Sequence, residues 1–137
     1  MAHTVQAVMT KNPTTVTPDT PATEAARIMK TEDTGIVPIV DGDRLGGVIT
    51  DRDLTLRILA EGKSPDTKVG ELASKDLVTI DPQQSLEEAA RLMAEHQIRR
   101  LPVVEEDGRL VGILAQKDLA EAGHDTLTGE VVERISR

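Results

Sequence analysis

Two polar residues at the end of an apolar stretch, Thr50 and Asp53, have the types and spacing that chemistry at a phosphate or a sugar requires. They close the segment from Gly47 to Asp53, which predicts a buried strand, a turn and the start of a helix. A carboxylate there can accept hydrogen bonds from both hydroxyls of a ribose. A helix N-terminus favours a phosphate, and Gly47 allows a ligand to approach the strand closely. The segment therefore predicts a ribose phosphate site.

The same spacing also has a purely structural interpretation. A threonine followed three residues later by an acidic residue is a capping box, which stabilises a helix by about 1 kcal/mol. Such a signal carries no function by itself. Both interpretations of Thr50 and Asp53 can hold together, so the rest of the chain must decide whether a ligand is involved.

Composition narrows the function classes. The chain has 137 residues, a formal net charge of −8, no cysteine and no aromatic residue. The charge and the missing rings argue against nucleic-acid binding, which uses basic surfaces and aromatic stacking. No apolar run approaches the roughly 20 residues that span a bilayer, and the first residues lack the layout of a signal peptide. We therefore expect a cytoplasmic protein with no membrane or nucleic-acid partner.

The chain is a tandem duplication. Pro18 recurs as Pro82, 64 residues later, and after a one-residue insertion near Gly108 the offset becomes 65, so that Asp53 recurs as Asp118. The matches extend over nearly everything from residue 5 to residue 119. We expect a first repeat at 1–63, a second at 64–123 and a tail at 124–137 that has the pattern of a short amphipathic helix.

Each repeat predicts the order β-α-β-β-α after a short opening segment. In the first helix of each repeat, apolar residues recur at helical spacing, with Thr20 or Ser85 as the N-cap and Met29 or Met93 in the core. Short polar connections with glycine predict hairpins. In the first repeat we expect an opening segment at 5–9, strands at 14–17, 37–40 and 45–49, and a closing helix at 52–61. In the second repeat we expect an opening segment at 69–73, strands at 78–81, 101–104 and 110–114, and a closing helix at 117–122. A half of this size is marginal alone, so we expect an α/β (α+β) fold with two halves packed sheet to sheet about a pseudo-two-fold axis.

The β-α-β-β-α unit resembles the CBS domain. The resemblance rests on the turns Ile36-Val37-Pro38 and Arg100-Leu101-Pro102 and on the closing Gly-apolar-x-Thr-x-x-Asp motif. Two such units in tandem look like a CBS pair, or Bateman module, similar to stand-alone bacterial proteins of the hypoxic-response type. The resemblance implies a non-enzymatic regulatory module that binds AMP, ADP, ATP or S-adenosylmethionine in the cleft between the repeats, dimerises, and acts on an effector protein that the sequence does not identify.

The resemblance also implies residue roles. Arg99 and Arg100 precede a strand and would meet the phosphate, since guanidinium groups form forks for its oxygens. Alternatively, Arg99 and Arg100 are solvated surface residues whose positive charges balance the nearby Glu105 and Glu106. The residues assigned to the first cleft, including the expected adenine contacts, are Asn12, Thr14, Thr34, Gly35, Ile36, Thr50, Arg52, Asp53, Arg99 and Arg100.

The second cleft is expected to be weaker. Asp118 is present, but Ala115 stands where the first repeat has the hydroxyl of Thr50, and Gly35 and Ile36 replace the arginines that would reach across. We expect this cleft to be empty or to hold a nucleoside. Its residues would be Val78, Arg100, Leu101 and Asp118.

Other function classes are weaker. A dimeric interaction scaffold with vestigial clefts is the main alternative to ligand binding. The sequence shows no nucleophile and base constellation, and His3, His96 and His124 lack metal-ligand spacing. We therefore expect no enzyme activity, no metal site and no required cofactor beyond the nucleotide ligand.

Overall fold

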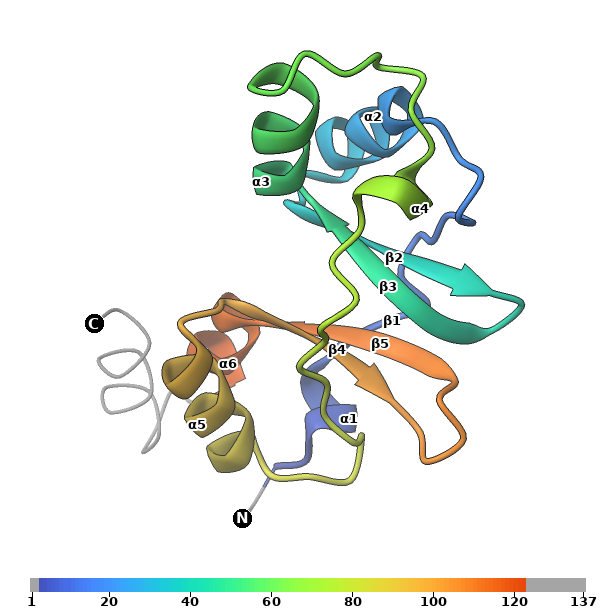
Figure 1. Cartoon of the computed structure of the whole chain (residues 1–137). Coiled ribbons are helices and arrows are strands. Elements are labelled where there is room, and N and C mark those ends of the chain that lie inside the picture. The colour runs from blue at the N-terminus through green and yellow to red at the C-terminus, as the bar shows by residue number, and fades with distance from the viewer. Residues whose placement is uncertain (1–2, 123–137) are drawn as a thin grey trace. The chain divides into compact units, whose positions relative to one another are not determined.

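The computed structural model describes residues 3–122, which form two compact units (Figure 1). Unit 2 is the continuous stretch Pro13–Leu77. Unit 1 combines the N-terminal residues up to Asn12 with the chain from Val78 onward. Each unit is described separately below. The expected sheet-to-sheet packing concerns the relation between the units and stays a prediction, and the tail at 124–137 lies outside the described residues.

Unit 2 is built on one antiparallel hairpin covered by helices. Strands β2 and β3 pair from Ile36 opposite Thr50 to Asp41 opposite Arg44, with a bulge between Ile39 and Val40. The turn needs a left-handed residue, which Gly42 supplies with φ of 68°. The elements are α2 (Ala22–Glu32), β2 (Ile36–Asp41), β3 (Arg44–Thr50), α3 (Asp51–Asp53), the π-helix η1 (Leu54–Leu59) and α4 (Val69–Leu72).

Unit 1 repeats this plan with a third strand. The order in its sheet is β1-β5-β4, all antiparallel, and the hairpin has a bulge between Val103 and Val104, at the same place as in unit 2. The predicted hairpin strands of both repeats are thus confirmed. The elements are α1 (Val5–Val8), β1 (Thr10–Lys11), α5 (Leu86–His96), β4 (Arg100–Val104), β5 (Leu110–Ala115) and α6 (Gln116–Ala122).

The compact units and the sequence repeats are different divisions of the chain. Helix α1 belongs to the first repeat, yet Val5 is fully buried in the core of unit 1. Helix α4 belongs to the second repeat, yet Val69 is fully buried in the core of unit 2. The boundaries expected at 1–63 and 64–123 therefore do not delimit the compact units, because each unit takes its opening segment from the other repeat.

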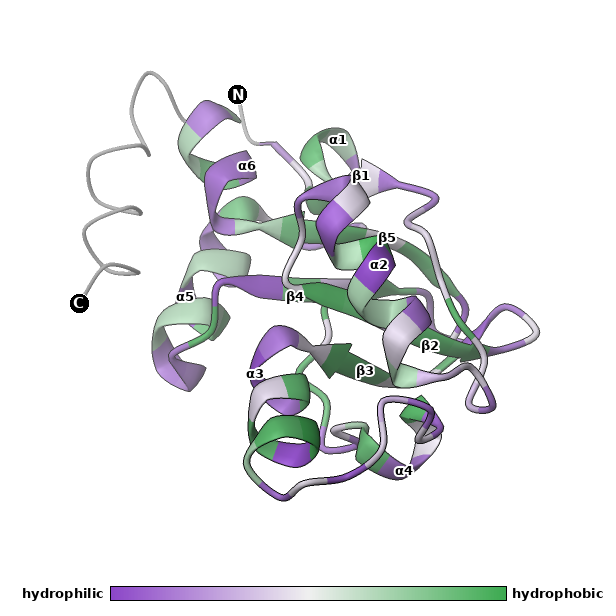
Figure 2. Ribbon diagram, turned by 90° about the horizontal axis from the view of Figure 1, so that it is seen from above, coloured by the Kyte–Doolittle hydropathy of each residue, from purple (hydrophilic) through white to green (hydrophobic). Residues whose placement is uncertain are grey.

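The core of each unit is aliphatic. Met29 and Met93 are buried, as predicted, and so are the apolar faces of α2 and α5. Figure 2 shows strands β3 and β5 as largely hydrophobic, while α2 and α5 carry hydrophobic and hydrophilic residues side by side. With no ring available, the two cores are closed by interlocking Val, Ile, Leu, Met and Ala side chains.

Two local predictions were wrong. The β runs expected at 14–17 and 78–81 form only single parallel bridges, Val16 to Ile39 and Ile80 to Val103, so one residue of each run joins its sheet. Thr20 does not cap α2, because its hydroxyl accepts the N–H of Thr17 instead, and Pro21 takes the N-cap position.

The other cap and the closing helices follow the sequence more closely. Ser85 Oγ accepts the N–H of Glu88 and begins α5, as predicted. The helix expected at 52–61 is the short α3 continued by the π-helix η1, and Gly62 with φ of 71° lies just beyond it. Among the described residues, no helix is long and apolar enough to cross a membrane.

Candidate functional site

The strand-to-helix junction of unit 2 is a closed capping box. The N–H of Thr50 donates to Asp53 Oδ2 at 2.9 Å, and the N–H of Asp53 donates to Thr50 Oγ1 at 3.1 Å. Both side chains are half-buried. The structural interpretation of this pair is therefore confirmed. The box also fixes the side-chain orientation of Thr50 and Asp53, which a ligand site requires.

The capping box leaves part of both side chains available. Asp53 Oδ1 has one long contact, 3.5 Å from Ser74 Oγ. Thr50 Oγ1 acts as an acceptor, so its hydroxyl proton can still be donated. The junction thus presents one acceptor and one donor, which suits a ribose hydroxyl and a phosphate oxygen.

The helix N-terminus is not free for a phosphate. The N–H of Asp51 donates to Gly35 O at 3.0 Å, and the N–H of Arg52 donates to Asp51 Oδ1 at 2.8 Å. The N–H of Asp53 is used by Thr50, and that of Leu54 by the carbonyl of Asp51. The expectation of free helix amides was wrong, because the protein itself satisfies them. A phosphate at this junction would need side-chain donors.

Several predicted adenine contacts lie beside this junction. Ile36 pairs with Thr50 across the hairpin, and the preceding Gly35 is buried. Thr34 Oγ1 turns back to the N–H and carbonyl of Ile36, at 3.3 and 3.2 Å. Thr14 is exposed, and its hydroxyl donates to Glu32 Oε2. Asn12, also exposed, falls in unit 1.

Two polar residues that contact predicted site residues, Ser74 and Glu32, were missed by sequence reasoning. Ser74 contacts Asp53 from 21 residues away, and Glu32 contacts Thr14 from 18 residues away. Neither has a motif that signals its position. Only the folding of α2 and of the chain after α4 against the hairpin brings them there.

The corresponding junction of unit 1 is half complete. The N–H of Ala115 donates to Asp118 Oδ2 at 2.8 Å, but Ala115 has no hydroxyl to return the bond. Burial raises the pKa of the Asp118 carboxyl, while the Ala115 N–H and the charge of Lys117 oppose this rise. The predicted difference between Thr50 and Ala115 is therefore visible as a difference in hydrogen bonding.

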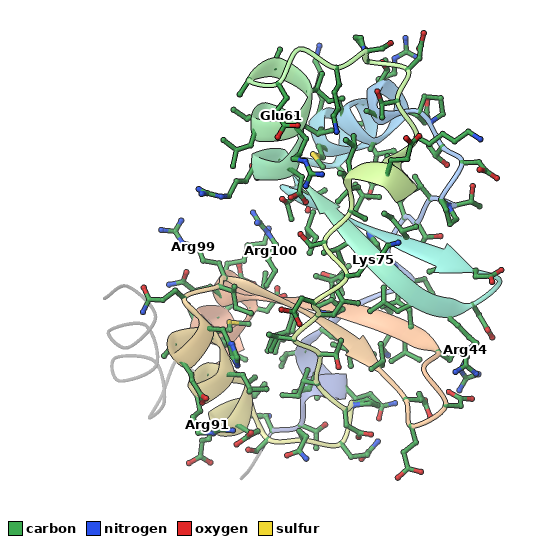
Figure 3. All side chains as sticks on the ribbon, in the orientation of Figure 1. Arg44, Glu61, Lys75, Arg91, Arg99 and Arg100 are labelled. Carbon is green, nitrogen blue, oxygen red and sulfur yellow. The ribbon has the colours of Figure 1, made fainter. Side chains whose placement is uncertain are left out.

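The two arginines lie at the start of β4. Arg100 pairs with Ala115, and the carbonyl of Arg99 accepts the N–H of Gln116 at 2.8 Å. Figure 3 shows both side chains extending away from α5 and the sheet. Within residues 3–122 neither forms a salt bridge, whereas Glu105 pairs with Arg109 at 3.3 Å. The surface-balance interpretation of Arg99 and Arg100 therefore has no support from these contacts.

The remaining residues of the second set, Val78 and Leu101, pack in unit 1. Leu101 is fully buried, and Val78 is half-buried against the same core. Arg100, Leu101 and Asp118 thus share one hairpin and its following helix. This is the arrangement of Ile36, Val37 and Asp53 in unit 2.

A protein-family model for the CBS domain matches residues 5–60 and 69–125. The chain belongs to the CBS domain family. The two matches account for most of the chain, and the repeated mixed fold of helices and strands is that of tandem CBS repeats.

Relatives place the chain among stand-alone CBS pairs of the hypoxic-response type. It is 47% identical over 116 residues to the CBS domain-containing protein YhcV of Bacillus subtilis, covering 85% of this chain and 82% of YhcV. It is 45% identical over 100 residues to Hypoxic response protein 1 of Mycobacterium tuberculosis, covering 72% of this chain and 69% of the relative.

Solved structures agree with this assignment. The crystal structure of Hypoxic Response Protein I with two coordinated zinc ions has a TM-score of 0.80 at 40% identity, over 87% of this chain and 98% of that one. The CBS pair of MJ0100 with 5'-methylthioadenosine and S-adenosylmethionine has a TM-score of 0.80 at 27% identity, over 89% and 96%. CBSX2 in complex with AMP has a TM-score of 0.78 at 32% identity, over 89% and 96%.

The zinc of Hypoxic Response Protein I has no evident counterpart in the described part of this chain. Among residues 3–122, no three His, Asp or Glu side chains gather into a group that could hold a metal ion, and the sequence has no cysteine.

Proposed function

We propose that this CBS pair is a regulatory module that binds an adenosine-containing ligand and performs no catalysis. The family assignment and the neighbours that hold AMP or S-adenosylmethionine support the ligand class. The observation that carries the proposal is the capping box of unit 2. It presents Asp53 Oδ1 and the hydroxyl proton of Thr50 side by side at a strand end lined by Ile36.

In this proposal Asp53 accepts hydrogen bonds from the ribose hydroxyls. Because the amides of α3 are already used, the phosphate is held by side chains: the hydroxyl of Thr50 and the cations Arg52, Arg99 and Arg100. The family resemblance, not a contact in the structure, assigns the last two to the same ligand. Thr34, Gly35, Ile36, Thr14 and Asn12 would surround the adenine.

The junction of unit 1 is proposed to be the weaker site. Asp118 Oδ2 accepts the N–H of Ala115, as Asp53 Oδ2 accepts that of Thr50, but Ala115 lacks the hydroxyl that Thr50 provides. Burial also raises the pKa of Asp118, so the charged form is less favoured than for an exposed carboxylate. Val78, Arg100, Leu101 and Asp118 would at most hold a nucleoside.

Titration calorimetry with AMP, ADP, ATP and S-adenosylmethionine tests this function. We expect saturable binding of at least one ligand and strong loss of affinity in Asp53→Asn. The asparagine oxygen can still accept the N–H of Thr50, so the variant removes the charge but keeps the cap. The matched variant Asp118→Asn should bind like the wild type. Absence of binding by all four ligands, or equal losses in both variants, would contradict the proposal.

A homodimer is the second part of the proposal, and exposed apolar residues on η1 support it. Leu56 is 43% exposed and Leu59 is 78% exposed. Because residues three apart are neighbours on a helix surface, the two leucines could form one apolar contact with a second copy of the chain. Analytical ultracentrifugation of Leu59→Lys should show a shift to monomer, while Ala26→Lys on the exposed face of α2 should not. If the wild type remained a monomer at high concentration, the homodimer proposal would be wrong.

An interaction scaffold without ligand remains the alternative function. It predicts no nucleotide-dependent rise in melting temperature together with a protein partner that binds the Asp53→Asn variant as well as the wild type.

The location is proposed to be the cytoplasm, and cell fractionation would test it.

A further inference from the structure

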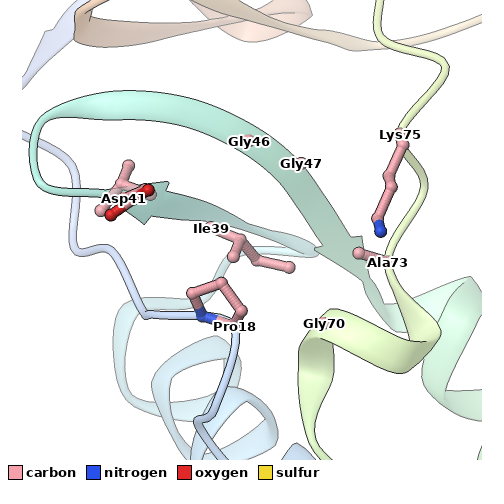
Figure 4. Close-up of a pocket in the computed structure, with 9 residues that line it drawn as sticks. Pro18, Ile39, Asp41, Gly46, Gly47, Gly70, Ala73 and Lys75 are labelled. Carbon is pink, nitrogen blue, oxygen red and sulfur yellow. The ribbon is translucent and has the colours of Figure 1, made fainter.

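Unit 2 contains a pocket that the adenosine site does not use. Its cavity volume is about 170 Å³, and it lies between the hairpin, the loop at Pro18 and the chain around α4 (Figure 4). Pro18, Ile39 and Ala73 give it an apolar lining. Gly46, Gly47 and Gly70 keep it open, since their backbones carry no side chain into the space.

The pocket extends from the middle of β3 toward the hairpin turn, and its residues Ala73 and Lys75 flank Ser74, whose hydroxyl contacts Asp53. Gly47 is three residues before Thr50 on β3, which at about 3.3 Å per residue is a separation of roughly 10 Å. Its small volume also excludes a nucleotide, because pockets for ligands of that size measure about 300 Å³ or more. The pocket is therefore a separate site.

Unit 1 serves as an internal control because three of the corresponding positions carry larger residues. By the repeat offsets, Gly46, Gly70 and Ala73 correspond to Val111, Gln6 and Met9. Met9 packs on Gly112 so closely that a methyl group built on the glycine would lie 2.5 Å from its sulfur.

One backbone hydrogen bond at this position recurs in both units. The N–H of Gln6 donates to Pro82 O at 2.9 Å, and the N–H of Gly70 donates to Pro18 O at 2.9 Å. At Gly47 the nearest side-chain atom is only the Cβ of Ala73, 3.4 Å from the corresponding methyl position. The space in unit 2 thus coincides with smaller side chains at these positions.

The size and the charge at the rim indicate what the pocket takes. A cavity of about 150 Å³ with an apolar lining accommodates a benzene-sized molecule of about six carbon atoms. Figure 4 shows the Lys75 side chain running toward Ala73, and within residues 3–122 its ammonium forms no salt bridge. Asp41 lies at the other end, beside the turn and opposite Arg44 in the hairpin register. Asp41 also forms no salt bridge within residues 3–122, but it lies beside the turn, so the charge next to Ala73 is the positive one of Lys75.

We propose that this pocket binds a small monocarboxylate with an apolar body of about six carbon atoms, whose carboxylate pairs with Lys75. The apolar body would occupy the space that larger side chains occupy in unit 1. The inference does not rest on the proposed adenosine site, since the pocket lining shares only Gly47 with the segment that predicted a ribose phosphate site.

A titration of the full chain with sodium 4-methylpentanoate, followed by amide NMR shifts, tests the proposal. Saturable shifts are expected at Gly46, Gly47 and Gly70, whose N–H groups report on the lining. The alcohol 4-methyl-1-pentanol and the cation 3-methylbutylamine should bind much more weakly. Absence of saturable shifts at these glycines, or equal binding of the alcohol or the amine, would overturn the proposal.

Variants of the lining make the test specific. Ala73→Met, which copies Met9, should abolish binding, and Lys75→Gln should weaken it by about tenfold or more. Lys68→Gln removes a neighbouring lysine that already pairs with Asp19 at 3.4 Å, so its affinity should equal that of the wild type. If Ala73→Met fails to fold, Gly46→Val, which copies Val111 and meets only Ile39 O at 3.8 Å, replaces it. Undiminished binding by the folded filling variant would refute the site.

Discussion

Thr50 and Asp53 hold each other in place through two hydrogen bonds of 2.9 and 3.1 Å, each from a backbone N–H to the other residue's side chain. At the corresponding pair in unit 1, only the bond from Ala115 to Asp118 exists. The hydroxyl of Thr50, which Ala115 lacks, therefore distinguishes the fully capped junction of unit 2 from the half-capped junction of unit 1. The second junction can serve as a reference for the first.

Exchange of that hydroxyl should change stability in opposite directions. Thr50→Ala should lower the free energy of unfolding by about 1 kcal/mol, because the N–H of Asp53 loses its acceptor. Ala115→Thr should raise it by a similar amount if the new hydroxyl accepts the N–H of Asp118. Urea denaturation measures both effects, and Thr50→Ser, which keeps the hydroxyl, is the control. A stable Thr50→Ala protein would show that the box contributes little.

Asp118 should make the fold respond to pH. Burial raises its folded pKa above the ordinary value of 3.8, so the folded state binds the proton more tightly than the unfolded state. Its carboxyl therefore adds stability as the pH falls through the folded pKa and removes stability as the pH rises. The difference in free energy of unfolding between Asp118→Asn and the wild type should therefore shift in favour of the variant as the pH rises from acid to neutral. Denaturation at several pH values measures this difference.

Glu88 provides a control of opposite sign for that experiment. Its hydrogen bonds to Arg91 lower its pKa below the ordinary 4.5, so its contribution is present above that value and is lost as the pH falls through the folded pKa. Glu88→Gln should therefore lose less stability than the wild type as the pH falls, which is the opposite of the trend expected for Asp118→Asn. The same trend in both variants would contradict the assigned causes.

Gly112 should tolerate a side chain less well than Gly47. A methyl group on Gly112 would lie 2.8 Å from the carbonyl oxygen of Thr10, as well as close to Met9, and backbone cannot move aside cheaply. On Gly47 the nearest atom, Ser74 O, is 3.3 Å away. We expect Gly112→Ala to cost about 1–3 kcal/mol and Gly47→Ala clearly less, measured by thermal or urea unfolding. Equal costs would indicate that β1 can shift.

The exchanged opening segments can be tested by hydrogen exchange. Val5→Ala should destabilise unit 1 by about 2 kcal/mol, because a fully buried side chain is truncated. Amide protection should then fall in β4 and β5 more than in β2 and β3. Val69→Ala should give the reverse pattern. If Val5→Ala instead lowered amide protection in β2 and β3, the assignment of α1 to unit 1 would be wrong.

The local features of the fold could be read from the sequence. The hairpins, the cap at Ser85 and the box at Thr50 follow from turn residues and from groups three residues apart, which the chain places together without distant help. The cap at Thr20 failed because Thr17, also three residues away, competed for the hydroxyl. Two local partners of equal reach cannot be ranked from spacing alone.

The sequence by itself determined the duplication, the two hairpins with the helices that flank them, and the difference between Thr50 and Ala115. Only the tertiary structure decided which unit receives α1 and which receives α4, and that Ser74 contacts Asp53. The reason is physical: α1 and α4 begin with the same buried valine, Val5 or Val69, so their patterns fit either hairpin equally well. The choice rests on burial and hydrogen bonds between segments far apart in the chain, and no local pattern encodes it.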